Sequence, residues 1–240
     1  MQRHPAEAAI ERHPHLAEPR RAGHVRVDMH SHTMFSGDST TTLDEIEESV
    51  RESAIDVLCV TDHNAIEGAV RLADALRGVC RVIVGEEVRT HTGEIIGLFL
   101  TGKIPFGANA METARQIRAQ GGLVYVPHPF DPMRRNLSEQ SLVELTAAGM
   151  VDAIEAHNSK TSLPSLNAKA RTFGESHGLA LGSGSDAHVP HALGSAYVEM
   201  ADFDGPQDFL EKLRDGVVVG HHWDKARPWS ARIVPSVSDY

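Results

Sequence analysis

The sequence predicts an α/β barrel, and three observations support that prediction. Short β-rich runs alternate with amphipathic helical runs along most of the chain, which is typical of βα units around a parallel sheet. About seven such units fit a closed or distorted TIM-like barrel better than an open sheet, and 240 residues is a common length for such a barrel. Hydrophobic residues make up 41% of the chain and charged residues 23%, which is the composition of an ordinary globular protein.

The first half of the chain carries recognisable helix starts and one tight turn. Thr42, three residues before Glu45, predicts a capping box, and Asn109 is expected to cap a later helix that ends at Gly121. The turn around Gly93 joins two strands directly. Strands are predicted at Val25–His30, Val57–Thr61, Arg81–Val88, Ile95–Leu100 and Leu123–Val126, and helices at Thr42–Ser53, Ile66–Leu76 and Asn109–Gln120.

The second half continues the alternation without a linker that would divide residues 24–222. We therefore expect one barrel domain over that range. Helices are predicted at Ser138–Ala148, Ser165–His177 and Pro206–Arg214, and strands at Ala153–Ala156, Leu179–Ser183, Ala196–Met200 and Val217–Gly220.

The two ends of the chain differ from the barrel in composition. Residues 1–23 are rich in Pro, Glu, Arg and Ala and lack apolar periodicity, so we expect a mobile extension there, whose role stays open, with a metal-binding tail as the minor alternative. Residues 223–240 contain Trp223, Trp229 and Pro228, which predicts a tail packed on the barrel. The remaining histidines outside the strand ends are expected to be surface or packing residues: His177, His191, His221 and His222.

Charge and cysteine usage exclude several classes of protein. The net charge of −10 argues against general nucleic-acid binding, which needs a basic face. No apolar run approaches the length of a membrane span, and the N-terminus lacks the apolar core of a signal peptide. Cys59 and Cys80 lie in or beside apolar segments, so reduced, buried thiols in a cytoplasmic protein are expected. The oligomeric state stays open.

Residues able to bind metal recur where the predicted strands end. The carboxyl ends of barrel strands converge on one face, so residues distant in sequence can form one site there. Six separate strand ends that all carry imidazole or carboxylate are hard to explain by packing. They carry His30 and His32, Asp62 and His63, Glu86 and Glu87, His128, Glu155 and His157, and Asp186 and His188.

The spacing within these motifs indicates metal ligation. His30 and His32 lie two apart, so both imidazoles point to the same side of a strand. Asp38 follows in a Gly-containing loop that can turn its carboxylate back over the strand end, although a turn or cap residue is the alternative. His63 is expected to be a ligand, and Asp62 to hold that ring or handle protons.

The later motifs add a bridging acid and further ligands. Strand alternation sends Glu86 and Glu87 to opposite sides, so one of them should face the barrel mouth, where a carboxylate can bridge two cations. The prolines on either side of His128 stiffen its turn. Asp186 and His188 repeat the two-apart spacing.

In this order the motifs resemble the PHP family, the polymerase and histidinol phosphatase domain of metal-dependent phosphoesterases. The resemblance covers nearly all of residues 25–222 and implies a distorted (β/α)7 barrel with two or three divalent metal ions. It also implies a role for each matching residue, with Glu87 chosen over Glu86 because the bridging acid of the family follows the glycine by two positions. The first ion is held by His30, His32, Glu87 and Asp186, the second by Glu87 and His128, and the third by Asp38, His63 and His188.

One position departs from the family. The family often supplies a further histidine to the second ion, shortly after the bridging acid, and here that strand position carries Glu94. His91 lies nearby in a turn, but in the wrong register. Either Glu94 is the ligand or the second site is weaker or empty, and an oxygen ligand moves metal preference toward manganese, iron or magnesium.

The resulting hypothesis is a metal-dependent hydrolase of a phosphate ester, most simply a monoester on a small molecule. Zinc, manganese or iron is expected, and magnesium less so. Shared cations would activate a water held near Glu87 and His63, and Asp62 or a nearby histidine would manage the proton of the leaving group. Arg134 and Arg135 are expected to bind phosphate, and His157 to contact substrate.

Two alternatives stay open. One is a metal-binding module without turnover. The other is a barrel hydrolase that acts on a non-phosphate bond, as amidohydrolases do. Those enzymes usually need a lysine at a central strand end, and the nearest one here, Lys160, lies well beyond the strand that ends at Ala156.

Overall fold

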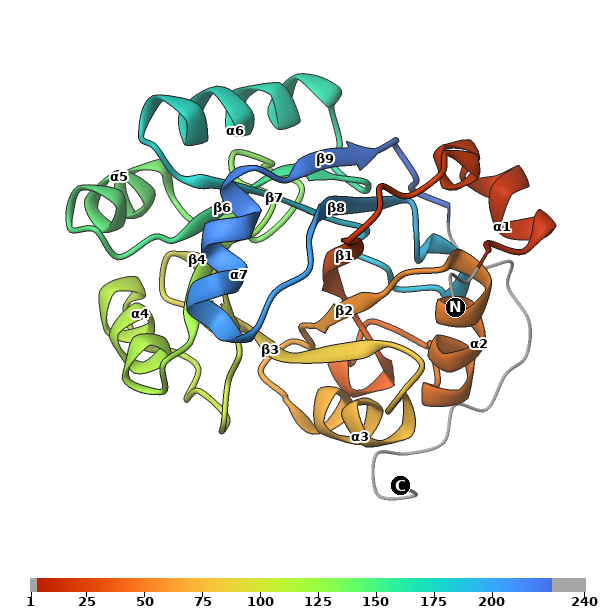
Figure 1. Ribbon diagram of the computed structural model, residues 1–240. Coiled ribbons are helices and arrows are strands. Elements are labelled where there is room, and N and C mark those ends of the chain that lie inside the picture. The colour runs from red at the N-terminus through yellow and green to blue at the C-terminus, as the bar shows by residue number, and fades with distance from the viewer. Residues whose placement is uncertain (1–3, 226–240) are drawn as a thin grey trace.

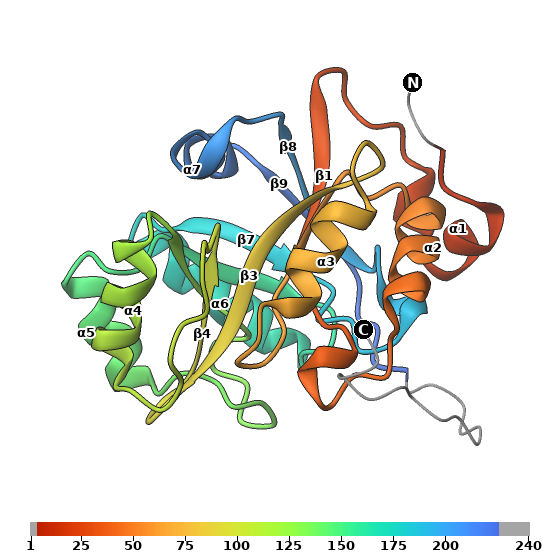
Figure 2. The same ribbon diagram turned by 90° about the horizontal axis from the view of Figure 1, so that it is seen from below.

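A computed structural model describes residues 4–225, which form a curved, nearly closed sheet with helices on its outside (Figures 1 and 2). The sheet has the order β7-β6-β5-β4-β3-β2-β1-β8-β9. Its strands are β1 (His24–Ser31), β2 (Val57–Val60), β3 (Arg81–Thr90), β4 (Gly93–Leu98), β5 (Leu123–Val126), β6 (Ala153–Asn158), β7 (Ala180–Gly184), β8 (Ala196–Ala201) and β9 (Val217–Gly220). The helices are α1 (Glu7–Arg12), α2 (Leu43–Ser53), α3 (Glu67–Ala75), α4 (Ala110–Ala119), α5 (Glu139–Ala147), α6 (Pro164–Ser176) and α7 (Gly205–Arg214). The predicted distorted TIM-like barrel is confirmed.

The sheet is mixed, whereas the alternation of elements predicted a parallel one. The β1-β2-β3 and β5-β6-β7 groups are parallel, but β4 runs antiparallel to both of its neighbours. The tight turn at Gly93 is the cause, because a parallel pair needs a long crossover connection. Beyond β1, β8 and β9 extend the sheet in antiparallel fashion.

The barrel closes between the end of β1 and the segment that follows β7. The backbone N–H of Asp186 donates to the carbonyl of His30 at 2.8 Å, and that of His32 donates to the carbonyl of Ala187 at 2.9 Å. These bonds bring the first and the last ligand motifs of the sequence side by side at the carboxyl ends of the strands.

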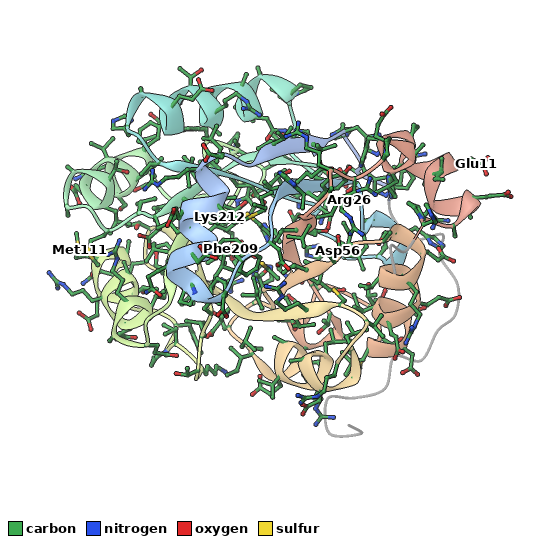
Figure 3. All side chains as sticks on the ribbon, viewed as in Figure 1. Glu11, Arg26, Asp56, Met111, Phe209 and Lys212 are labelled. Carbon is green, nitrogen blue, oxygen red and sulfur yellow. The ribbon has the colours of Figure 1, made fainter. Side chains whose placement is uncertain are left out.

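Helix α7 covers the opposite end of the barrel. Its Phe209 is fully buried in an apolar cluster that draws side chains from the first eight strands, and its ring centroid lies 5.3 Å from that of Phe99, which follows β4. Lys212, one turn later, is only half-buried (Figure 3). One end of the barrel is therefore sealed by apolar packing, which leaves the carboxyl end for polar residues.

The predicted helix starts are present. The Thr42 hydroxyl accepts from the backbone N–H of Glu45, and the Glu45 carboxylate accepts from that of Thr42, so the capping box is complete. The Asn109 side chain accepts from the backbone N–H of Glu112 at 2.8 Å. These caps fix where α2 and α4 begin.

The prediction of a mobile N-terminal extension is wrong for residues 4–23. Ala9, His13 and Leu16 are buried against the barrel beside α2 and β8, and Arg12 forms an ion pair with Glu52 at 2.8 Å. The helix α1 has only six residues, too few to show a periodic apolar pattern, and tertiary contacts stabilise it.

At the other end, the structure describes the tail only as far as Lys225. The backbone N–H of Trp223 donates to the carbonyl of Ser159 at 2.8 Å, and its side chain packs against the apolar cluster that includes Ala192 and Leu193. Trp229 and Pro228 lie outside the described residues, so a packed tail stays a prediction there. Cys59 and Cys80 are buried and free, as expected. No helix among the described residues has the length and apolarity to cross a membrane.

Candidate metal centre

The nine residues predicted to hold metal come together at the carboxyl end of the barrel. Their donor atoms fall into four overlapping groups, and within each group the atoms lie within 4.8 Å of one another. The groups are His30, His32 and Asp186; His30, Glu87 and His128; His63, Glu87 and Glu94; and His32, Asp38, His63 and His188.

Glu87 lies between these groups and is 1% exposed. Its Oε1 is 2.9 Å from Nε2 of His128, and its Oε2 is 3.3 Å from Nε2 of His30 and 3.1 Å from Nδ1 of His63. The two oxygens of one carboxylate thus face different sets of imidazoles, which is the placement that bridging two cations requires.

Asp186 and Asp38 serve the inner and the outer side of the cluster. Oδ1 of Asp186 is 3.3 Å from Nε2 of His32, and both residues are buried. Oδ2 of Asp38 is 3.1 Å from Nε2 of His63 and 3.2 Å from Nε2 of His188. The Asp38 side chain is 51% exposed, so this outer group borders solvent.

Glu94, and not His91, faces the cluster. Glu94 is 2% exposed, and its Oε1 lies 3.7 Å from Nδ1 of His63. His91 is exposed in the turn and belongs to none of the donor groups found among the described residues. The departure from the expected histidine therefore leaves a carboxylate in that place.

The polar atoms of the cluster satisfy one another poorly, which tests whether cations fit. Nε2 of His30 and Nε2 of His32 face each other at 3.0 Å. Nδ1 of His128 and Oε1 of Glu94 are buried without a hydrogen-bond partner within the described part of the chain, and Nδ1 of His63 makes no hydrogen bond there although it lies 3.1 Å from Glu87. Imidazole and carboxylate lone pairs that converge in this way are the ligand set of divalent transition metals. The residues fit such ions.

Comparison with protein families decides what this site belongs to. A model described as PHP domain matches residues 28–172, and a model described as PHP-associated matches residues 164–218. The chain belongs to the PHP domain family. The first match contains the ligands from His30 to His128, and the second contains Asp186 and His188.

Several proteins resemble this PHP domain. An uncharacterized protein of Methanocaldococcus jannaschii is 32% identical over 200 residues, which cover 79% of each chain. A two-domain protein of Bacteroides vulgatus, described as containing a predicted PHP-like metal-dependent phosphoesterase, has a TM-score of 0.67 at 17% identity over 85% of this chain and 67% of that chain. PsfC of Pseudomonas syringae has a TM-score of 0.62 at 16% identity over 82% of this chain and 92% of its own. Both solved structures share the fold.

Carboxylates give the PHP centre a strong affinity for positive charge. Burial lowers the pKa of His30, but Glu155, Asp186 and Glu87 outweigh it and raise that pKa well above its usual value. At His63 burial is likewise outweighed, by Asp38 and Glu87, and the pKa rises to about 9. Despite burial, neighbouring cationic groups hold the pKa of Glu87 well below its usual value. Divalent cations would replace the protons that these carboxylates attract.

Backbone strain also concentrates at this end of the barrel. His128 and Asp186 have positive φ values of 28° and 50°, in a region that residues with a side chain rarely adopt. Strain of this kind persists where surrounding bonds impose it. The backbone N–H of His128 donates to the Glu155 carboxylate at 2.6 Å, and the backbone N–H of Asp186 donates to the carbonyl of His30 at the point where the barrel closes. The strained turns aim both side chains into the cluster.

A second layer of polar residues holds the ligands. Glu155 accepts from the His30 ring at 3.1 Å as well as from the backbone of His128, and it is fully buried. The Ser36 hydroxyl lies 2.8 Å from Nδ1 of His32 and accepts from the backbone N–H of His63. Sequence reasoning noted Glu155 at a strand end without a role and overlooked Ser36. The need of each ligating ring for a partner on its other nitrogen was the available signal.

Asp62 does not occupy the catalytic position predicted for it. It is fully buried, and its two oxygens accept from the backbone N–H and the hydroxyl of Thr33 at 2.6 and 2.7 Å. Burial raises the pKa of Asp62 to about 6. Both oxygens are used to tie the segment after His32 to the end of β2, so Asp62 is a positioning residue.

His157 and Glu86 point away from the centre. The strand β6 is irregular between Glu155 and His157, so their side chains do not follow simple alternation. His157 packs against Gly220 of β9, which contradicts its predicted contact with substrate. Glu86 accepts from the backbone N–H of Ile104 at 2.7 Å, on the opposite side from Glu87, as the alternation predicted.

A cavity of about 170 Å³ opens over the centre. Arg134 and Arg135 line it together with Arg89, which the sequence did not single out. Arg134 donates to the carbonyl of Lys160 at 2.9 Å. Lys160 also reaches the site, because its Nζ lies 2.9 Å from Nδ1 of His188, so the expectation that it lies too far from a strand end is wrong.

Proposed function

We propose that this PHP domain hydrolyses a phosphate ester, most simply a monoester of a small organic molecule. One observation carries the proposal: the two oxygens of Glu87 face separate groups of imidazoles, with a cavity lined by arginines directly above. Family membership supports it, as does the likeness to a Bacteroides vulgatus protein described as containing a predicted metal-dependent phosphoesterase.

The donor set favours zinc, manganese or iron, in two or three sites. Five imidazoles and four carboxylates provide a mixed set of nitrogen and oxygen ligands, whereas magnesium prefers oxygen ligands and retained waters. When bound, such cations lower the pKa of a shared water and neutralise phosphoryl oxygens. Glu94 adds a further oxygen donor beside Glu87, which favours manganese or iron for the ion that they would share.

The residues of the chain then have distinct tasks. Arg134 and Arg135 can bind phosphoryl oxygens by bidentate hydrogen bonds and orient the ester over the centre. Glu87 and His63 would hold cations that supply an activated water as the nucleophile. Asp62 takes no proton from substrate, since both of its oxygens are held by Thr33.

The test is phosphate release from a panel of phosphorylated metabolites by protein loaded with manganese or zinc. We expect His30→Ala and Asp186→Ala to abolish turnover and lower the metal content. The matched control is His157→Gln. His157 also lies at the carboxyl end of a strand, β6, but outside the cavity, so this variant should retain turnover and metal content. Phosphate release that survives both alanine substitutions would defeat the proposal.

One observation supports a second candidate, a hydrolase of a non-phosphate bond. Lys160 contacts His188, and a lysine at the centre is a feature of the amidohydrolase alternative. Glu87, however, already lies between the donor groups where a bridging ligand is needed. Cleavage of amides or lactones without phosphate release would favour this candidate, and bound metal without any turnover would favour a binding module.

A further inference from the structure

A second cavity, of about 350 Å³, lies directly beside the cavity over the metal centre. The two share three lining residues, Asp38, Arg134 and His188, so they meet at the outer edge of the centre. We call the second cavity the side compartment. Its remaining lining residues are Thr40, Lys160, Val189, Ala192, Trp223, Asp224 and Lys225.

The side compartment is cationic in a chain that is acidic overall. Arg134, Lys160 and Lys225 line it, whereas the net charge of the whole chain is −10. Of its two acids, Asp38 lies 3.2 Å from His188 and would be neutralised by a cation bound there. Asp186, 3.9 Å from Nζ of Lys160, is likewise a predicted metal ligand, so among the lining residues Asp224 alone then opposes the three cations and the compartment attracts anions.

Lys160 has a contact that metal binding would break. Its Nζ lies 2.9 Å from Nδ1 of His188, and the same Nδ1 lies 2.9 Å from the carbonyl oxygen of Asp186. If Nε2 of His188 binds a cation, Nδ1 of the neutral ring must carry the proton and can donate only to that carbonyl. An ammonium cannot donate to an N–H group, so Lys160 loses this acceptor. Its Nζ then keeps only the longer contact of 3.9 Å with Oδ1 of Asp186 and can also bind an anion in the compartment.

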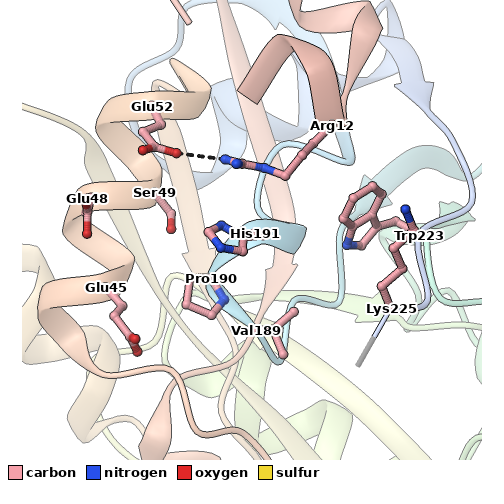
Figure 4. Close-up of a pocket in the computed structure, with 10 residues that line it drawn as sticks. All are labelled: Arg12, Glu45, Glu48, Ser49, Glu52, Val189, Pro190, His191, Trp223 and Lys225. Carbon is pink, nitrogen blue, oxygen red and sulfur yellow. Dashed lines mark hydrogen bonds and ion pairs between the residues drawn. The ribbon is translucent and has the colours of Figure 1, made fainter. Parts of the chain in front are cut away.

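The far wall is formed by Trp223 and Lys225, which lie side by side at one edge of a neighbouring cavity (Figure 4). Nζ of Lys225 is 4.4 Å from the indole ring centroid, in cation–π contact. That neighbouring cavity, of about 440 Å³, has Glu45, Glu48 and Glu52 on its other side. Arg12 pairs with Glu52 on that side, but Glu45 and Glu48 would still repel an anion that passed beyond Lys225, which favours negative charge in the side compartment.

We propose that the side compartment binds a second anionic group, a carboxylate or a phosphate, on the alcohol part of the substrate. The substrate would place its scissile phosphate under Arg134 and Arg135 and its second anion between Lys160 and Lys225. This inference rests on the proposed phosphoesterase function. It defines the substrate class as phosphate esters whose leaving group is itself negatively charged.

Binding of stable analogues tests the inference without turnover. Calorimetry on manganese-loaded protein would compare phenylphosphonate with 3-carboxyphenylphosphonate and benzene-1,3-bisphosphonate. We expect the two analogues that carry a second anionic group to bind roughly tenfold more tightly than phenylphosphonate, because that group can form one or two charge-assisted hydrogen bonds. A preference shown by only one of the two analogues identifies the second anion as carboxylate or phosphate.

Two lysine variants and a control locate the effect. Lys160→Gln and Lys225→Gln should each reduce the preference roughly threefold or more, since exposed charge pairs contribute modestly. Lys103→Gln, an exposed lysine between β4 and α4 that lines none of these cavities, should leave the preference unchanged. Thermal unfolding confirms that each variant is folded. Equal affinity for all three analogues, or a preference that neither lysine variant lowers, overturns the inference.

Turnover separates this inference from the function on which it rests. Phenyl phosphate and 1,3-phenylene bisphosphate are the matched substrates. Hydrolysis of both at equal kcat/KM, with equal analogue affinity, would refute the side compartment and leave the phosphoesterase intact. Selective analogue binding that depends on the lysines, without hydrolysis of any phosphate ester, would refute the function and retain the anion site.

Discussion

Residues 4–225 contain two clusters of buried or half-buried histidines, and the two clusters differ in the side chains that surround them. At the carboxyl end of the barrel, five imidazoles share space with four carboxylates. Where the N-terminal segment crosses β8 and β9, His13, His15 and His221 form a second cluster, the N-terminal histidine cluster. There Nδ1 of His13 is 2.9 Å from Nε2 of His221, and Nε2 of His13 is 2.8 Å from the carbonyl oxygen of His191.

The carboxylates decide the difference between the two clusters. In the metal centre they raise the pKa of His30 and His63 in spite of burial. In the N-terminal histidine cluster burial acts first, neighbouring imidazoles and arginines add to it, and the pKa of His13 and of His15 falls to about 4. Neutral rings there bond to backbone carbonyls and act as packing. Proximity of histidines alone therefore does not define a metal site.

The largest expected effect comes from removing the shared carboxylate. Glu87→Gln keeps the size of the side chain but removes the charge that faces both donor groups. We expect loss of bound metal and a fall in kcat/KM of roughly a thousandfold, since several kcal/mol of charge stabilisation disappear. Elemental analysis and phosphate release measure the two effects. His13→Gln, the corresponding change in the other cluster, should keep its metal, and if it loses as much metal as Glu87→Gln the contrast is wrong.

Chelation should lower stability through the metal centre alone. Ions that bind only the folded chain stabilise it by about 3–4 kcal/mol when their free concentration is 100 to 1,000 times Kd. Denaturant unfolding with and without a chelator measures this difference. His13→Gln should show the full difference and Glu87→Gln almost none. An equal response of the two variants would show that the ions stabilise the fold from elsewhere.

Much of the centre could be predicted because its signals are local. Several ligands lie at the end of an apolar strand or directly after it, as His63 follows Val57–Val60, and a barrel collects such ends on one face. The choice of Glu87 over Glu86 needed only strand alternation and the family pattern. The barrel itself followed from the alternation of strands with capped helices.

The remaining features depend on tertiary geometry that the sequence does not display. His157 was misplaced because β6 is irregular between Glu155 and His157, which breaks the period of two. Asp62 was given a catalytic role because the position of Thr33 across the strand ends was unknown. Lys160 reaches the centre through a loop, and loops carry no periodic signal. The N-terminal segment is held by contacts with α2 and β8 that lie far away in sequence.

A smaller effect is expected one layer behind the ligands. Glu155→Gln removes the charge that orients the His30 ring, and loss of such partners typically lowers metal affinity by about 10- to 100-fold. Competition with a metal-binding dye measures the affinity. His157→Gln, two positions later on the same strand, should leave it unchanged because that ring packs against Gly220. An equal loss of metal affinity in both variants would mean that the substitutions destabilise β6 and that Glu155 has no specific effect on the His30 ring.

The smallest expected effect is a pH dependence of stability from the N-terminal histidine cluster. The pKa of His13 is about 4 in the folded chain, against 6.5 for an exposed imidazole, so the unfolded chain binds more protons between those values. The free energy of unfolding should therefore fall as the pH is lowered from about 6.5 to 4, and this group contributes no further change below that range. His15, His221 and Arg12 face the ring and all disfavour its protonation, whereas the carbonyl of His191 favours it.

His13→Gln isolates this contribution. Groups outside the N-terminal histidine cluster, including the metal centre, titrate alike in both proteins, so the difference between their urea unfolding curves reports on this cluster. We expect the variant to lose about 1–2 kcal/mol less than the native chain between pH 6.5 and 4.5. Parallel pH profiles would mean that burial does not lower the pKa of His13. In that case the absence of carboxylates would not be what separates this cluster from the metal centre.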